Sequence, residues 1–254
     1  MAVSGSTQRF SSRVGDYVRF RPTYPPQIIQ LLQEECGLAP ASVVADIASG
    51  TGIFTRLLLE NGNQVYGVEP NAEMRRAGEE FLTKYRRFNS VAGKAEATTL
   101  PDHSIDIATC AQAAHWFDLA NARKEFVRIL KPGGWAVLLW NERRTDSTPF
   151  LREYEQLLLA FGSDYKEVRH ERTTETIHQF FDPSPFKLQT FEMFQQCDAE
   201  ALKGRLLSSS YVPQAGSSNY SQMIAELHRV FETNQIHGFV TLEYNTLVYY
   251  AQLA

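Results

Sequence analysis

Several features that mark particular classes of protein are missing from this sequence. Only three cysteines occur among 254 residues, namely Cys36, Cys110 and Cys197, and no CxxC pair is present. An odd number of widely spaced cysteines argues against a disulfide framework and against a zinc site. The six histidines show no metal-ligand spacing, so we expect no bound metal. Cys110 ends an apolar run and is expected to be a small buried residue.

Long apolar runs and a strong charge bias are also absent. No stretch of about 18 apolar residues occurs, so no membrane span is expected. The N-terminus lacks the apolar core of a secretory signal, which predicts a cytoplasmic location. A formal net charge of −4 argues against a broad nucleic-acid-binding face. Nothing in the pattern specifies an oligomeric state.

Strand and helix patterns alternate regularly between residues 43 and 140. Apolar runs typical of strands lie at residues 43–47, 64–68, 89–92, 104–110 and 135–140. Such alternation predicts right-handed βαβ units and a Rossmann-like, doubly wound, mostly parallel sheet. Strand patterns at 186–194 and 239–251 flank helical segments. They predict a seventh, antiparallel last strand and an inserted helical lobe.

These patterns divide the chain into three parts. Residues 1–37 form an N-terminal arm or lid and a first helix, because prolines near residue 25 preclude an earlier continuous helix. Residues 38–141 form the α/β core. Residues 142–254 complete the sheet and supply the helical lobe, and we expect the sheet to continue across the boundary near Asn141.

The first two predicted strands each end in an acidic residue. Asp46 closes the first strand and begins the pattern D-x-A-x-G-x-G, which continues through Ala48, Gly50 and Gly52. Glu69 follows the second strand. Because the carboxyl ends of neighbouring parallel strands meet at one edge of a sheet, the two carboxylates are expected to share one ligand site.

Two common nucleotide-binding motifs do not fit this loop. A dinucleotide-binding G-x-G-x-x-G pattern places Thr55 or Ile53 at its third glycine, depending on the frame. A phosphate-binding P-loop requires a lysine, and none lies in the loop. A nicotinamide-dependent oxidoreductase is therefore disfavoured.

The loop and its successor resemble motif I and the following acidic residue of class I S-adenosylmethionine-dependent methyltransferases, which usually carry Gly where this chain has Ala48. Further segments resemble that family at residues 91–101, 104–108 and 129–134. The resemblance is to the group with the type 11 methyltransferase domain and covers about residues 43–140. Residues 21–25 and 209–213, together with Tyr17, resemble the trans-aconitate methyltransferase-like subgroup.

This resemblance implies S-adenosylmethionine as cofactor, with S-adenosylhomocysteine as product. It implies that Asp46 contacts the amino acid part of the cofactor, directly or through water. It also implies that Glu69 accepts hydrogen bonds from both ribose hydroxyls. Met74 packs on the adenine or is an ordinary core residue, and Glu96 or its neighbours read the adenine edge. The implied cofactor-binding set is Asp46, Ala48, Ser49, Gly50, Gly52, Glu69, Pro70, Met74, Ala95, Glu96, Ala97, Ala111 and Gln112.

The loop after the fourth predicted strand carries the candidate catalytic residue. His115 has a side chain whose ordinary pKa suits proton removal near neutrality. It could instead orient the substrate or be structural. Trp116 lines an acceptor pocket or packs in the core, and Asp118 most simply caps the next helix.

Four residues outside the core are candidates for a lid and an acceptor site. Tyr17, Arg21 and Tyr24 are expected to cover the cofactor, or else to form a surface arm that packs on the domain. Arg21 could hold a carboxylate by paired hydrogen bonds. Tyr211, on the predicted lobe, is expected to reach the acceptor pocket.

The predicted reaction is methyl transfer to a small-molecule acceptor, with a carboxylate as one option, by in-line displacement. A carboxylate acceptor requires no base. A phenol, an amine or a carbon acid must lose a proton, and the base role of His115 then becomes important. A non-catalytic S-adenosylmethionine-binding protein is the alternative. A nucleic-acid methyltransferase is disfavoured by the acidic charge balance.

Overall fold

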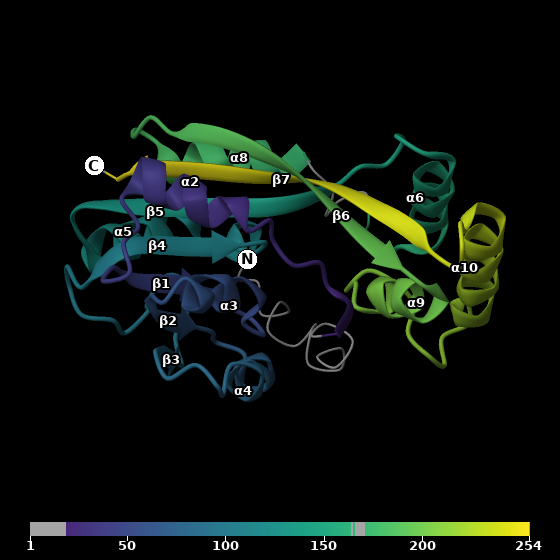
Figure 1. Ribbon diagram of the computed structural model, residues 1–254, viewed down its shortest axis with the longest axis horizontal. Coiled ribbons are helices and arrows are strands. Elements are labelled where there is room, and N and C mark those ends of the chain that lie inside the picture. The colour runs from purple at the N-terminus through teal and green to yellow at the C-terminus, as the bar shows by residue number, and fades with distance from the viewer. Residues whose placement is uncertain (1–18, 164, 166–170, 254) are drawn as a thin grey trace.

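The computed structural model describes residues 19–163, 165 and 171–253, and it contains one seven-stranded sheet (Figure 1). The strands lie in the order β3-β2-β1-β4-β5-β7-β6. Their bounds are β1 Val43–Ile47, β2 Gln64–Val68, β3 Phe88–Val91, β4 Ile105–Ala111, β5 Leu130–Arg143, β6 Lys187–Cys197 and β7 Val240–Gln252. Strands β1 to β5 pair in parallel. The last strand, β7, runs antiparallel to both of its neighbours. The predicted fold class is therefore confirmed.

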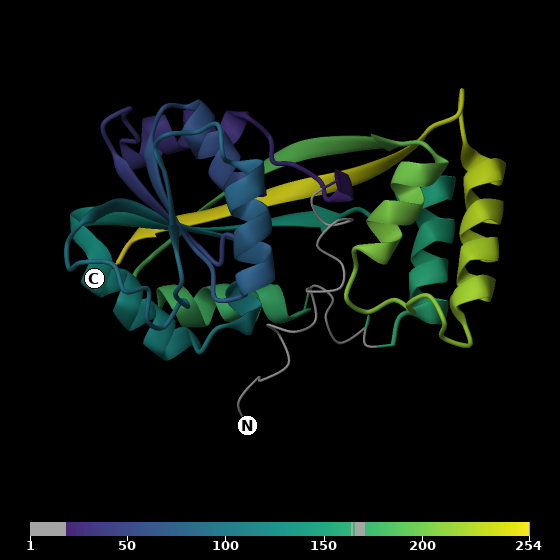
Figure 2. The same ribbon diagram turned by 90° about the horizontal axis from the view of Figure 1, so that it is seen from below.

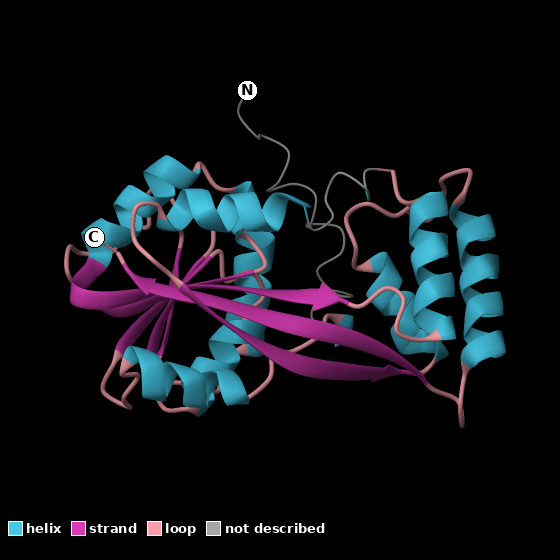
Figure 3. Cartoon of the chain, turned by 90° about the horizontal axis from the view of Figure 1, so that it is seen from above, coloured by secondary structure: helices cyan, strands magenta, loops and turns pink. Residues whose placement is uncertain are grey.

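Helices cover both faces of the sheet (Figure 3). On one face, apolar residues of α2 and α3 pack against β1 and β2. On the other face, α5 and α8 pack against β4 and β5. The helix bounds in this part are α2 Gln27–Cys36, α3 Ile53–Glu60, α4 Ala72–Phe81, α5 Leu119–Ile129 and α8 Glu171–Phe181. The sequence patterns described above do not indicate helix α8.

The inserted lobe lies beyond the α/β core, beside the far ends of the three longest strands (Figure 2). Its helices are α6 Pro149–Phe161, α9 Ala199–Leu207 and α10 Tyr220–Asn234. They bury a second apolar cluster that includes Leu242 and Tyr244 of β7. Strand β5 crosses residue 141 and continues into the lobe, so the expected continuity of the sheet is confirmed.

The register explains how one sheet serves both parts of the molecule. Strands β5 and β7 pair without interruption from Trp135 and Gln252 to Arg143 and Tyr244. Because β1, β2, β4 and β5 are parallel, their carboxyl ends all point toward the lobe. The lobe therefore faces the sheet edge at which ligands of such folds bind.

All three cysteines are buried and free, which confirms the expectation for Cys110. None of the described helices combines the length and the apolar character needed to span a bilayer.

Candidate functional site

The strand order reverses between β1 and β4, and the candidate site lies at that point. From β1 the chain moves outward to β2 and β3, then returns to the other side of β1 with β4. Connections leave such a pair in opposite directions and open a crevice beyond the carboxyl ends. The residue directly after each strand has a left-handed backbone: φ is 56° at Ala48 and 62° at Gln112.

The loop after β1 is a tight turn that depends on small residues. Gly50 and Gly52 have φ values of 57° and 82°, in the region where side chains are strained. A Cβ atom on Gly52 would lie 2.6 Å from Cδ1 of Leu82, so the position is also sterically closed. Ala48 adopts the same left-handed region at a small energetic cost, and the predicted turn is kept.

Asp46 is enclosed at the carboxyl end of β1, with 1% of its surface exposed. Its two carboxylate oxygens accept hydrogen bonds from the hydroxyls of Thr55, at 2.6 Å, and Thr109, at 3.0 Å. Burial raises the pKa of Asp46 to about 6, because desolvation outweighs these two hydrogen bonds. The site therefore holds a costly negative charge that a cationic ligand group would stabilise.

Glu69 lies next to the loop at the end of β2 and is also buried, with 7% exposed. Its Oε2 accepts the N–H of Gly50 at 2.9 Å, and its Oε1 accepts the N–H of Asn71 at 2.8 Å. Burial raises the pKa of Glu69, while these two N–H groups oppose the rise. Each oxygen retains a second lone pair, so the carboxylate can still accept from two hydroxyls.

Helix α4 packs directly on the loop. A Cβ atom on Gly78 would lie 3.2 Å from the carbonyl oxygen of Gly50 and 3.4 Å from the carbonyl carbon of Thr51. The terminal methyl of Met74 would lie 3.4 Å from a Cβ on Gly50, which places this side chain against the loop. Asn71 caps the helix by accepting from the N–H groups of Glu73 and Met74.

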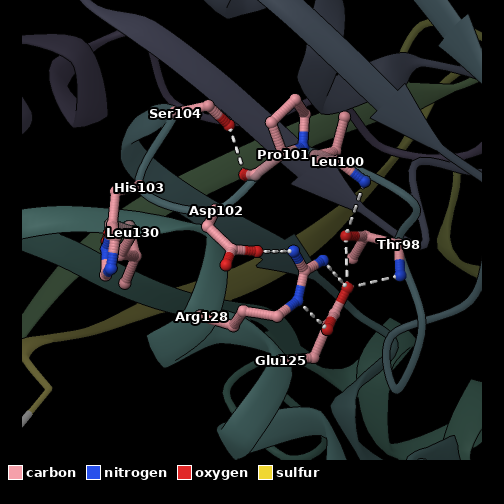
Figure 4. A network of polar contacts seen from close by, with 9 residues as sticks. All are labelled: Thr98, Leu100, Pro101, Asp102, His103, Ser104, Glu125, Arg128 and Leu130. Atoms are coloured by element: carbon pink, nitrogen blue, oxygen red, sulfur yellow. Dashed lines mark hydrogen bonds and ion pairs between the residues drawn. The ribbon is translucent and has the colours of Figure 1, made fainter.

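The segment after β3 carries the residues expected near the adenine and is fixed to α5 by a polar network (Figure 4). Glu125 Oε1 accepts from both the N–H and the hydroxyl of Thr98, at 2.7 and 2.5 Å. Arg128 donates to Glu125 and to Asp102. Burial acts to raise the pKa of Glu125, but hydrogen bonds from Arg128 and Thr98 outweigh it and lower the pKa to about 2.

Within that segment, Ala95 is buried while Ala97 is exposed. Glu96 accepts the N–H of Asp118 at 2.9 Å, so its carboxylate joins this segment to the start of α5. Asp118 accepts from the N–H of Asn121, which confirms its expected role as helix cap. Pro70, after Glu69, is exposed.

The loop after β4 places several predicted residues beside the crevice. Gln112 donates from Nε2 to the carbonyl of Asn141, and its backbone N–H donates to the carbonyl of Leu139. His115 lies in a short 3-10 helix, Ala114–Trp116, and is exposed. The ring centroids of His115 and Trp116 are 4.7 Å apart. The base role of His115 stays a prediction.

Arm and lobe meet through the residues expected to form the lid. Arg21 donates from Nη2 to the carbonyl of Ser208 at 2.8 Å, directly after α9. Tyr24 instead packs edge-on against Phe54 of α3, with ring centroids 5.1 Å apart. Tyr211 lies in the lobe, with its ring 5.0 Å from that of Tyr165. Tyr17 lies outside the described residues.

Three threonines in the site were not among the sequence predictions. Thr55 and Thr109 hold the Asp46 carboxylate, and both are fully buried. The hydroxyl of Thr51, between the two loop glycines, is enclosed and has no hydrogen-bond partner within the described chain. Only Thr51 carries a local sequence signal, since it lies between the two loop glycines, whereas Thr55 and Thr109 reach Asp46 from other elements. A polar, partly cationic cofactor would fit these residues. They offer the unsatisfied hydroxyl of Thr51, a glycine turn that backbone can approach closely, and the two buried carboxylates of Asp46 and Glu69.

Comparison with known proteins agrees with this geometry. Residues 45–138 match the methyltransferase domain family. The chain is 38% identical over 164 residues to an uncharacterized methyltransferase of Mycobacterium tuberculosis, covering 65% of this chain and 63% of that protein. It is 33% identical over 150 residues to an uncharacterized methyltransferase of Schizosaccharomyces pombe, covering 59% and 58%. The matches span about three fifths of the length of these relatives.

A solved structure supports the same fold over nearly the whole chain. The protein comes from Anaeromyxobacter dehalogenans, and its assignment as a type II methyltransferase is provisional. It superposes with a TM-score of 0.67 at 23% identity and covers 92% of this chain and 98% of its own. Residues 45–138 of this chain are therefore similar to a methyltransferase domain, and the Rossmann-like fold of the whole chain is that of the superposed structure.

Proposed function

We propose that this protein transfers the methyl group of S-adenosylmethionine to a small-molecule acceptor. The observation that carries the proposal is the buried Glu69 carboxylate, held beside the Gly50 amide at the end of β2. A carboxylate fixed in this way offers one oxygen to each hydroxyl of a ribose diol. Its position next to a glycine turn lets the backbone approach the rest of the cofactor.

Asp46 supplies the second contact in this proposal. Its buried charge is well suited to the cationic amino group of the methionine part, directly or through water. In this proposal the adenine packs against Met74, which lies on the loop beside Gly50, and against the segment from Ala95 to Ala97. The bound cofactor supplies an electrophilic methyl group on a sulfonium.

The chain then has to align the acceptor and exclude water. With the cofactor held by Asp46 and Glu69, the acceptor atom would bond to the methyl carbon as the carbon–sulfur bond breaks, and the bonding pair would stay on sulfur. If the acceptor is a carboxylate, no proton needs to leave. If it is a phenol or an amine, a base must take the proton, and His115, in the loop after β4, is the candidate.

The test is a calorimetric titration of S-adenosylmethionine and S-adenosylhomocysteine into the wild type, Glu69→Ala and Glu80→Ala. Glu80 is an exposed acid on α4 and provides a matched charge change away from the loop. Loss of the ribose contact should weaken binding by about tenfold to a hundredfold in Glu69→Ala, with no change in Glu80→Ala.

Absence of binding by folded wild-type protein would contradict the proposal, and a parallel titration with nicotinamide cofactors would then test that alternative. Cofactor binding without turnover of carboxylates, phenols, amines or carbon acids would favour a non-catalytic binding protein. We place the protein among small-molecule enzymes rather than nucleic-acid enzymes because its net charge is −4.

A further inference from the structure

A buried arginine in the lobe has no acidic partner among the described residues. Arg205, on α9, is 9% exposed. Its Nε donates to the hydroxyl of Tyr244 at 3.3 Å, and its Nη1 donates to the hydroxyl of Ser209 at 3.1 Å. Both partners are neutral, and within the described chain Nη2 makes no hydrogen bond. Arginine stays protonated in proteins, and buried charges are ordinarily paired.

The neighbouring Arg143 provides the contrast. Arg143 is equally enclosed, but it forms an ion pair with Glu155. Its guanidinium also lies 5.1 Å from the ring centroid of Tyr154. Tyr154 and Tyr244, which contact Arg143 and Arg205, belong to the same packed group of lobe side chains, so the two arginines share one cluster. Two buried cations and one carboxylate leave this described cluster with an uncompensated positive charge.

The register places this charge on the cofactor side of the lobe. Arg143 and Tyr244 are paired residues of β5 and β7, and Asn141 pairs with Thr246 two residues along. The hydroxyl of Thr246 donates to Asn141, whose carbonyl accepts from Gln112 at the end of β4. Tyr244 and Thr246 lie on the same face of β7, about 7 Å apart. Arg205 therefore contacts the residue of β7 that lies two positions from Thr246, on the side of the lobe.

We propose that the guanidinium of Arg205 holds a carboxylate of the methyl acceptor, at the end of the acceptor remote from the atom that is methylated. This inference rests on the proposed function. A guanidinium matches a carboxylate through two parallel hydrogen bonds, and Nη2 with Nη1 provides such an edge. The acceptor class is thus an elongated anion with its nucleophilic group at the opposite end.

The probes are linear dicarboxylates of increasing length, namely succinate, adipate and suberate, titrated into protein saturated with S-adenosylhomocysteine. Tyrosine fluorescence and calorimetry report binding, because Tyr244 contacts Arg205 directly. Wild type should bind suberate saturably and more tightly than succinate. It should not bind the diol of the same length or phosphate with similar affinity.

The variants are Arg205→Met, Arg205→Lys and Arg152→Met. Arg152 is an exposed arginine of α6 and controls for loss of one lobe charge. Suberate binding should weaken about tenfold or more in Arg205→Met, less in Arg205→Lys, and not at all in Arg152→Met. The affinity for S-adenosylhomocysteine should be the same in all three.

Equal suberate binding by wild type and Arg205→Met would overturn the inference, as would no saturable dicarboxylate binding by wild type. If either occurs while S-adenosylhomocysteine still binds, the proposed function survives and only the role of Arg205 fails. If Arg205→Met does not fold, Tyr244→Phe tests the same site. This substitution keeps the charge of Arg205 but removes the hydroxyl that accepts from its Nε. The affinity for suberate should still fall several-fold.

Discussion

At the scale of single residues, the site combines groups that stabilise the fold with groups that destabilise it. Glu125 and Asp46 are both enclosed carboxylates. Arg128 and Thr98 lower the pKa of Glu125 to about 2, so its charge supports the folded state at neutral pH. Asp46 receives only two hydroxyl hydrogen bonds, and its pKa is raised to about 6. An acid kept ionised against its surroundings is typical of a ligand site.

This difference predicts the behaviour of Asp46→Asn. The folded protein binds a proton at Asp46 up to about pH 6, whereas the unfolded chain releases it near pH 4, so ionised Asp46 opposes folding above that window. Asp46→Asn should raise the free energy of unfolding at pH 7 by up to about 3 kcal/mol, and the gain should fade as pH falls from about 6 to 4. Urea unfolding of both proteins at several pH values measures this difference in the free energy of unfolding.

The same substitution should weaken binding of S-adenosylmethionine, because the cationic amino group loses its counter-charge. Asp146→Asn, at an exposed position, is the control and should change neither quantity. A destabilised Asp46→Asn protein at pH 7 would mean that the Thr55 and Thr109 hydrogen bonds outweigh the cost of burial.

Ala48 illustrates what residue patterns can predict. The spacing of small residues after the first strand indicates a tight turn even though alanine replaces the usual glycine, and the observed φ of 56° agrees. The hydroxyls of Thr55 and Thr109 carry no such local signal, because their partner Asp46 comes from another element. Residues that act through tertiary contacts are therefore missed by reading one segment at a time.

At the scale of elements, helix α4 packs directly on the loop after β1. Gly78 lies inside this helix, where glycine is about 1 kcal/mol less favourable than alanine. The reason is its close approach to the backbone of Gly50 and Thr51. An isolated glycine in a helical pattern is a sequence signal for such packing.

Gly78→Ala should therefore separate stability from binding. The gain in helix propensity offsets the tight contact, so the free energy of unfolding should change by less than about 1 kcal/mol. The added methyl should move the loop by a few tenths of an ångström and weaken S-adenosylhomocysteine binding by about threefold to tenfold. Thermal unfolding and calorimetry on Gly78→Ala and Glu80→Ala measure both. Unchanged affinity in Gly78→Ala would show that the loop position is set elsewhere.

Alternation of strand and helix patterns predicted the order of elements in the core correctly. Helix α8 was missed because its packing partners lie on α5 and β5 rather than in its own neighbourhood. The extension of β5 to Arg143 was missed as well, since the predicted strand stops at Trp140. Pairing with β7 stabilises this polar extension, and pairing is not visible in one strand alone.

At the scale of the whole molecule, Asn141 connects the core, the arm and the last strand. Its side chain donates to the carbonyl of Thr23 and accepts from the fully buried hydroxyl of Thr246 at 2.6 Å. A buried hydroxyl that loses its partner costs about 1–3 kcal/mol. This junction should therefore contribute to stability out of proportion to its size.

A double-mutant cycle tests the junction. Asn141→Ala should lower the free energy of unfolding by about 1–3 kcal/mol, and Thr246→Val alone should also destabilise. The double variant should cost about 1 kcal/mol less than the sum, because no unsatisfied hydroxyl remains. Thr241→Val, a half-exposed position on the same strand, serves as control. Strict additivity in urea unfolding would mean that the two side chains do not interact in solution.

The uninterrupted pairing of β5 with β7 has a consequence for the way in which related proteins can diverge. The paired strands join core and lobe without a hinge. The number of residues in β5 and β7 therefore fixes the distance between the loop after β1 and the lobe. Under the proposed function, substitutions in α6, α9 or α10 would alter the surroundings of the acceptor and leave that distance unchanged. If the proposed function holds, related proteins that keep this ladder can differ in acceptor through changes in three helices while they keep the same cofactor site.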